Sequence, residues 1–308
     1  MALCPDGDPH HPHALMHPSQ TDWANDVRRG ARPSADALRA HLLAVHRANA
    51  GFTESCARRC RDGTGRSTYA WLADLVPPGA EVLDLACGSG PLLAEILGRD
   101  VDARLTGVDM SVDELSLARQ RVGRGVALHE GLAQDLSRFA PESFDLVLCH
   151  WALTLMDPVA PVLAEVHRVL RPGGRFAAIV DGEMGADAGY RAAHDVIYGW
   201  VRRELPHYGT FDLGDPRVRT AKSLRALAED VFGAQAVSVE AGVFSLSDAA
   251  DRLAQEAAGF FYASFVLSPA ARKNMLAELA QQLAARGTAR FALPVNRLVA
   301  QKAAAPHG

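Results

Sequence analysis

Residues Glu81–Gly90 read EVLDLACGSG, an apolar run that ends in a glycine turn. The run holds one acid, Asp84, and is followed at residues 91–99 by PLLAEILGR, which has the apolar spacing of a helix. A strand that passes through a glycine turn into a helix is the first half of a βαβ unit. Gly88 and Gly90 also allow the backbone to approach a bound group closely. The stretch therefore predicts a parallel sheet with a ligand site at this turn.

Strand and helix patterns alternate along most of the remaining chain. Apolar strand patterns occur at residues 81–87, 103–110, 126–132, 144–153, 175–181, 235–246 and 289–302. Helical patterns of about ten residues separate most of them. This rhythm predicts an α/β fold, a Rossmann-like seven-stranded and mostly parallel sheet with helices on both faces.

Composition and rhythm divide the chain into six segments. We expect a flexible tail at 1–32, a helical cap at 33–76, a ligand-binding core at 77–181, an inserted lid or substrate segment at 182–220, completion of the α/β core with helical additions at 221–302, and a tail at 303–308. The first segment is rich in Pro, His, Asp and Gly and lacks periodicity. Its histidines could bind a metal, but prolines separate them, so we favour a polar tail and expect no metal site. They are His10, His11, His13 and His17.

The overall composition excludes several classes of protein. The 308 residues are 48% hydrophobic and 22% charged with a net charge of −4, and no Lys/Arg-rich run suggests a nucleic-acid surface. No apolar run approaches the roughly 20 residues that span a bilayer, and the N-terminus has no signal pattern. The five cysteines form no C-x2-C pair. We expect a cytoplasmic protein with a small-molecule partner, no nucleic acid and no membrane, and leave its oligomeric state open.

The glycine turn is compatible with two adenosine-containing cofactors. A dinucleotide fingerprint is G-x-G-x-x-G, but Leu93 stands where its third glycine would be. The loop has no basic residue for a pyrophosphate. Asp109 follows Gly90 by 19 residues, at the end of the second strand, and suits a carboxylate that accepts both ribose hydroxyls. Because nicotinamide cofactors and S-adenosyl-L-methionine (SAM) both use such an acid, Asp109 alone leaves the choice open.

Four ordered motifs carry a wider resemblance. VLDLACGSG at 82–90, LTGVDMS at 105–111, GLAQDLSRFAPESFDLVLCHWALTLM at 131–156 and VHRVLRPGGRF at 166–176 closely resemble the motifs of class I SAM-dependent methyltransferases of the small-molecule type. The resemblance covers residues 66–181, and FALPVNRLVAQK near the C-terminus is similar to that family's last strand. It implies SAM as cofactor and S-adenosyl-L-homocysteine (SAH) as product.

The resemblance also implies roles for particular residues. Asp84 would organise water or the amino end of the methionine moiety, Asp109 would hold the ribose, and Met110 would pack on the adenine. An acid often found in the family is replaced by Leu132, so Gln134 or Asp135 would have to accept from the adenine amine. The residues implied at the cofactor are Arg66, Tyr69, Asp84, Ala86, Gly88, Gly90, Asp109, Met110, Ala133, Gln134 and, through its backbone carbonyl, His150.

The chemistry implied is methyl transfer to oxygen, nitrogen or carbon of a small organic acceptor in specialised metabolism. His150 ends a strand at the ligand edge and is a candidate general base, or else a wall of the pocket. Trp151, Tyr190 and His194 are candidate acceptor contacts. Two alternatives stay open: a SAM-binding enzyme of the same fold that catalyses another reaction such as cyclisation, and a non-catalytic SAM-binding protein.

A thermal unfolding assay tests the cofactor directly. We expect SAH to raise the melting temperature and NADH and NADPH to leave it unchanged, because a ligand that binds only the folded state stabilises it by mass action. A shift with NADH and none with SAH would reverse the assignment.

Overall fold

The computed structural model describes residues 17–211, 213–285 and 289–305. Three of the tail histidines, His10, His11 and His13, lie outside the described residues, as does Cys4. Within these ranges no helix is long and apolar enough to cross a membrane.

The predicted α/β sheet is confirmed. Its strands are β1 (Ala80–Leu85), β2 (Ala103–Asp109), β3 (Ala127–Glu130), β4 (Phe144–His150), β5 (Leu170–Asp181), β6 (Val237–Ser247) and β7 (Arg290–Gln301). Their order is β3-β2-β1-β4-β5-β7-β6. The pairs among β1 to β5 are parallel, whereas β7 runs antiparallel to both β5 and β6.

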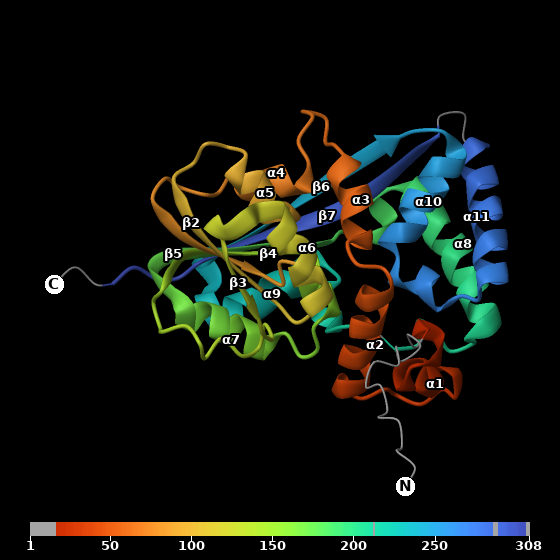
Figure 1. Ribbon diagram of the computed structural model, residues 1–308, viewed down its shortest axis with the longest axis horizontal. Helices are drawn as coiled ribbons and strands as arrows, with labels where there is room; N and C mark the ends of the chain where they lie inside the picture. Colours follow the sequence, from red (N-terminus) through yellow and green to blue (C-terminus); the bar gives the residue numbers. More distant parts are fainter. Residues whose placement is uncertain (1–16, 212, 286–288, 306–308) are drawn as a thin grey trace, which may run out of the picture.

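Helices cover the sheet on both faces (Figure 1). The helices α4 (Thr68–Ala73), α5 (Pro91–Leu97) and α6 (Val112–Val122) lie on one face, and α7 (Ala160–Val169) and α9 (Ala221–Phe232) lie on the other. Successive residues of a strand accordingly pack into the core on alternate faces of the sheet. Val82 packs into the core on the α5 side, and Leu83 packs into the core on the α7 side. Successive strand residues point to opposite faces, so a strand buried on both sides is apolar throughout.

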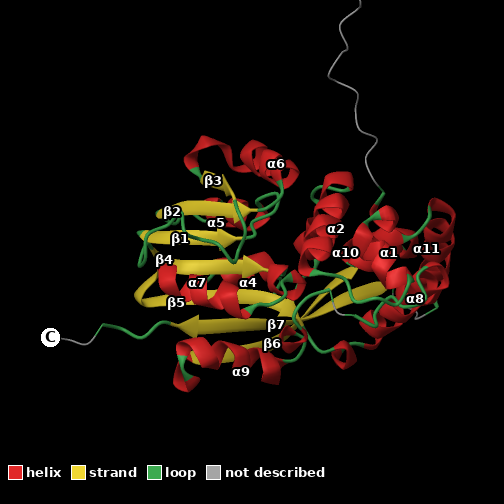
Figure 2. Ribbon diagram, turned by 90° about the horizontal axis from the view of Figure 1, so that it is seen from below, coloured by secondary structure: helices red, strands yellow, loops and turns green. Residues whose placement is uncertain are grey.

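The remaining helices gather at one end of the sheet. They are α1 (Asp22–Arg28), α2 (Ala35–Ala48), α3 (Phe52–Arg59), α8 (Ala188–Glu204), α10 (Ala250–Phe260) and α11 (Pro269–Ala284). The arrowheads of β1, β2 and β4 point toward this cap (Figure 2). The cap, which we define as these six helices and their connections, therefore stands over the carboxyl ends of the parallel strands.

The described part of the N-terminal segment is not a tail. Residues 17–32 contain a 3-10 helix and α1, and the Thr21 hydroxyl accepts a hydrogen bond from the Ala24 N–H at the start of α1. Trp23 is buried and stacks on the His41 ring of α2 at 4.3 Å. The expectation of a flexible segment up to residue 32 was wrong here, because α1 is too short to show helical periodicity yet buries Trp23 and Val27 against the cap.

Acid stability should depend on His41. Burial lowers the pKa of this ring to about 4, and its Nδ1 lies 2.9 Å from the Thr21 hydroxyl. Between about pH 6.5 and pH 4 the unfolded state therefore binds a proton that the folded state does not, so the free energy of unfolding falls as pH falls. The loss is at most about 3 kcal/mol.

We expect His41→Gln to flatten this dependence. Urea unfolding at about pH 7.5 and about pH 5 measures it. The exposed His17→Gln variant is the matched control and should keep the wild-type slope. Equal slopes for His41→Gln and wild type would contradict the burial of a neutral ring.

Candidate active site

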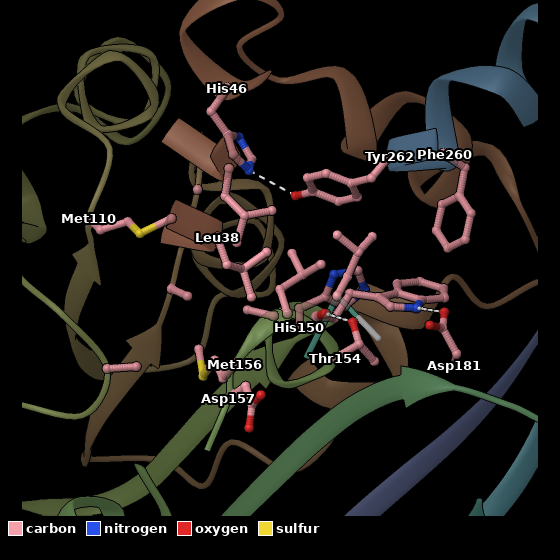
Figure 3. Close-up of a pocket in the computed structure, with 18 of the residues that line it drawn as sticks. Leu38, His46, Met110, His150, Thr154, Met156, Asp157, Asp181, Phe260 and Tyr262 are labelled. Atoms are coloured by element: carbon pink, nitrogen blue, oxygen red, sulfur yellow. Dashed lines mark hydrogen bonds between the residues drawn. The ribbon is translucent and has the colours of Figure 1, made fainter. Parts of the chain in front are cut away.

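One cavity of about 690 Å³ lies between the sheet and the cap. This volume is in the range of small-molecule and cofactor sites. Its floor is the glycine loop and the ends of β2, β4 and β5, and its roof comes from α2, α8 and residues 260–262. Figure 3 shows Leu38 and His46 of α2 together with Phe260 and Tyr262. The cavity is continuous from the glycine loop to the aromatic residues of the cap, so a cofactor and an acceptor could share it.

At the glycine loop, Asp109 ties two turns together. Its Oδ2 accepts from the Gly88 N–H and its Oδ1 from the Ser111 N–H, both at 2.8 Å. The loop needs left-handed backbone at Gly88, with φ of 53°. Gly90 has another role than the expected one, since it does not line the cavity. A Cβ there would come within 3.2 Å of the Ala118 Cβ, so Gly90 lets α5 pack against α6.

Buried carboxylates surround the loop. Asp84 is 1% exposed, and neither of its carboxylate oxygens has a hydrogen-bond partner in the described chain. Burial, and then the charge of Asp109, raise the pKa of Asp84 well above its usual range. Glu114, also buried, places Oε2 4.0 Å from the position of a Cβ on Gly88. A pyrophosphate would be repelled here, whereas a ligand with ammonium and sulfonium groups would compensate the charge.

A clamp that the sequence analysis missed closes over the same loop. The Arg121 guanidinium of α6 donates to both carboxylate oxygens of Glu54 on α3, at 2.5 and 2.6 Å, and to the Ser89 carbonyl at 2.8 Å. The Ser89 hydroxyl donates to Glu54 at 2.6 Å. Bidentate Arg–carboxylate pairs have fixed geometry. The clamp therefore fixes the cap helix α3 against the glycine loop.

Of the other residues expected at the cofactor, five line the cavity and Arg66 does not. Met110, Ala133 and Gln134 line the cavity, together with Ala86 and Tyr69. By contrast, Arg66 is exposed and does not line the cavity. Its guanidinium lies 3.0 Å from Asp62 and 3.5 Å from Asp74. The expected contact of Arg66 with the cofactor has no geometric support, because these surface ion pairs hold the side chain away from the cavity.

The His150 ring is a poor candidate for a base. Its Nε2 lies 2.9 Å from the Thr68 hydroxyl, and its ring stacks on Tyr69 at 3.8 Å. None of its hydrogen bonds within the described ranges joins it to a carboxylate. Burial lowers the pKa of the ring to about 3, so it is neutral at physiological pH and binds a proton weakly. The pocket-wall alternative fits this environment better.

The three expected acceptor residues all line the cavity beyond His150. Trp151 has φ of 64° and donates from Nε1 to Asp181 at 2.7 Å. Arg219 donates to the other oxygen of Asp181 at 3.2 Å. Tyr190 is buried with its ring 5.4 Å from that of Phe261. His194, the third expected residue, stacks on Tyr198 with the ring centroids 4.0 Å apart. The acceptor end is thus mainly aromatic, with one braced carboxylate.

Metal ligation has no candidate site in the described ranges. No group of three or more His, Cys, Asp or Glu side chains there could hold an ion. Cys56 and Cys60, on or just after α3, have their Sγ atoms 3.8 Å apart in the core.

Sequence comparisons identify the core. A family model described as "Methyltransferase domain" matches residues 83–178. A demethylmenaquinone methyltransferase of Symbiobacterium thermophilum is 37% identical over 108 residues, which are 33% of this chain and 43% of that protein. A 2-phytyl-1,4-naphtoquinone methyltransferase of Thermosynechococcus vestitus is 33% identical over 144 residues, which are 45% of this chain and 62% of that protein. The chain thus spans less than two thirds of these curated relatives.

Solved structures agree on the fold. A Bacillus halodurans C-125 protein described as a methyltransferase has a TM-score of 0.52 and 16% identity, over 77% of this chain and 99% of that one. The resemblance to class I SAM-dependent methyltransferases is confirmed for residues 83–178, which match the methyltransferase domain. The cyclase SpnF shares the fold at a TM-score of 0.53 and 18% identity, over 89% of this chain and 97% of that one. SAM is the cofactor of this methyltransferase domain, and the buried carboxylates suit its positive charge.

Removing the charge of Asp84 should separate stability from cofactor binding. Asparagine has nearly the same size, so Asp84→Asn relieves an unpaired buried charge. The ligand-free methyltransferase should melt at a higher temperature, and the gain should grow with pH because the wild-type carboxyl loses its proton. Its affinity for SAM should fall at least about tenfold, ~1.4 kcal/mol.

Calorimetry and thermal unfolding over a pH series check both effects. The exposed Asp102→Asn variant is the control and should change neither. Unchanged SAM affinity in Asp84→Asn would remove the carboxylate from the cofactor site.

Proposed function

We propose that this methyltransferase transfers a methyl group from SAM to an oxygen, nitrogen or carbon atom of a small, largely apolar and aromatic acceptor. The single observation that carries the proposal is the continuous cavity. It joins the charged end at Asp84 and Asp109 to the aromatic end at Trp151, Tyr190 and Phe260. Such a cavity suits a small organic molecule better than a polymer.

Residues of the glycine-loop end would hold the cofactor. All four line the cavity: Asp109 would accept from the ribose hydroxyls, Met110 and Ala133 would flank the adenine, and Asp84 would face the cationic end of the cofactor. When bound, SAM supplies a methyl group to a nucleophile while the carbon–sulfur electron pair stays on sulfur. The Glu54–Arg121 clamp would hold α3 beside the loop while the cofactor is bound.

The cap would orient the acceptor. Trp151 meets Phe260 edge to face at 4.9 Å, and Asp181 and Arg219 fix the Trp151 indole from behind. Rigid aromatic walls hold a flat molecule with little loss of side-chain entropy. Positioning of the two reactants is the main contribution that a protein makes to a displacement of this kind.

The acceptor remains open within this class. The curated relatives are named for quinone substrates, demethylmenaquinone and 2-phytyl-1,4-naphtoquinone, which are apolar and aromatic. However, α2, α8 and residues 260–262 lie outside the matched residues 83–178. A cap so elaborated favours a distinct acceptor, as enzymes of specialised metabolism require. The fold alone would also serve a cyclisation, since SpnF has it.

An acceptor panel tests the proposal. The protein is incubated with SAM and with phenols, quinols, amines and carbon acids, and mass spectrometry follows both SAH release and the acceptor. We expect SAH in proportion to an acceptor heavier by one methyl group. Asp109→Ala should weaken SAM binding by about 1–3 kcal/mol, because it leaves ribose hydroxyls unpaired.

The alternatives give different products. An acceptor that isomerises without SAH release would support cyclisation. Tight SAM binding with neither product across the panel would support a non-catalytic role.

A further inference from the structure

Three polar side chains form a hydrogen-bonded chain on the cavity wall. His46 Nδ1 lies 2.7 Å from Glu114 Oε1, and His46 Nε2 lies 2.8 Å from the Tyr262 hydroxyl. All three residues line the cavity, and Figure 3 shows the Tyr262 ring directed toward His46. They come from α2, α6 and the 3-10 helix Tyr262–Val266, so only the assembled cap and core bring them together.

The neighbouring groups fix which nitrogen carries the proton. Glu114 Oε1 also accepts from the Gly51 N–H at 3.0 Å, so this carboxylate acts as an acceptor toward its neighbours. His46 Nδ1 must then donate to it. In the neutral ring the other nitrogen, Nε2, is an acceptor, and the Tyr262 hydroxyl donates to it. A carboxylate that orients a histidine in this way also stabilises the imidazolium that forms on proton uptake.

The two histidines of the cavity differ in this respect. His150 has a hydroxyl and an aromatic ring as partners, whereas His46 has a buried carboxylate behind it. Proton uptake by His150 would create an uncompensated buried cation. Uptake by His46 would create an ion pair. The geometry therefore moves the role of base from the strand end to the cap.

We propose that the Glu114–His46–Tyr262 chain takes up the proton of the acceptor. The inference rests on the proposed function. It applies to an acceptor whose reacting hydroxyl or N–H group still carries its proton at neutral pH. The acceptor proton passes to the Tyr262 oxygen as the Tyr262 proton passes to His46 Nε2. The electron pair of the broken O–H or N–H bond stays on the acceptor for the new bond to carbon. Tyr262 ends neutral, and His46 ends as an imidazolium beside the Glu114 carboxylate.

The surroundings of His46 agree with this assignment. From the core, the Glu114 carboxylate contacts the His46 ring at 2.7 Å. From the cap, His46 meets the Tyr262 hydroxyl and the ring of Phe52 at 5.3 Å. Arg47, the neighbouring cation, is directed to Asp113 at 3.6 Å.

The first test needs no acceptor. Nitrogen-15 NMR of the full chain with SAH bound reports which imidazole nitrogen carries the proton. We expect neutral His46 to be protonated at Nδ1, and Glu114→Gln to reduce that preference. A wild-type ring protonated at Nε2, or a preference that Glu114→Gln leaves unchanged, would overturn the proposal.

The second test separates a base from a structural support. With a phenolic acceptor, His46→Gln should lower kcat about 10²–10³-fold and remove the acid limb of its pH profile. KM and the affinity for SAH should stay within about threefold, since a base acts mainly in the transition state. Tyr262→Phe, which removes one hydroxyl, should lower kcat about tenfold or more. His129→Gln, on β3 away from the cavity, is the control and should match the wild type.

Results that would overturn the proton chain differ from results that would overturn the proposed methyl transfer. A His46→Gln enzyme with the wild-type kcat, or with a lower kcat but an unchanged pH profile, would overturn the base. If His46→Gln fails to fold, Tyr262→Phe and the wild-type NMR spectrum still decide. A wild-type protein that binds SAM and methylates nothing would remove the proposed function. In that event an Nε2-protonated ring would overturn the inference as well, and an Nδ1-protonated ring would support an acid–base role for His46.

Discussion

Two buried carboxyl groups at the carboxyl ends of β1 and β2, whose pKa values burial raises, are the constraint on which the site depends. Two backbone amides satisfy Asp109, whereas Asp84 on the neighbouring strand has no partner in the described chain. An isolated buried carboxylate has an effective desolvation cost of order several kcal/mol. A bound cation that faces the carboxylate would offset this desolvation cost in the protein–ligand complex. The glycine loop is therefore suited to a cationic nucleoside, and the rest of the cavity is arranged around that end.

Two polar contacts between the cap and the core run through α6. This helix carries both Glu114, which accepts from His46 and Gly51, and Arg121, which binds Glu54. The two residues lie about two turns apart, on the same face of the helix. Because the same helix lines the cofactor end, any displacement of α2 or α3 disturbs charged groups beside the glycine loop. The polar contacts that hold α2 and α3 against the core therefore lie beside the glycine loop.

The sequence predicted the core well and the cap poorly, for a physical reason. Strand periodicity and the glycine turn are local signals, so the sheet and the positions of Asp84, Asp109 and His150 follow from short segments. The α1 helix has only seven residues and shows no such signal. The structure gives the Arg66 assignment no support, because a resemblance places a backbone position but not the ion pairs that hold a long side chain.

The polar contacts of the cap depend on distant pairings. His46 and Tyr262 are separated by 216 residues, and a single sequence gives no measure of such proximity. One local signal was available. Glu114 and Arg121 are charged residues at two-turn spacing on a helix that packs on the sheet, and charge on a face expected to be buried indicates a partner. That signal points to α6 as a contact surface, although not to Glu54 or His46.

The contrast between the two histidines shows why a motif cannot assign a base. The end of β4 fixes the position of the His150 backbone. The His150 carbonyl therefore lies at the carboxyl edge of the sheet whichever side chain the residue carries. Basicity is set instead by the groups that face the ring. Around His150 these are a hydroxyl and aromatic rings, and burial lowers its pKa to about 3. Around His46 they include a carboxylate that the fold holds in place from two sides. The proposed proton chain therefore joins Glu114 of the core to His46 and Tyr262 of the cap, and these two cap residues lie outside the matched residues 83–178.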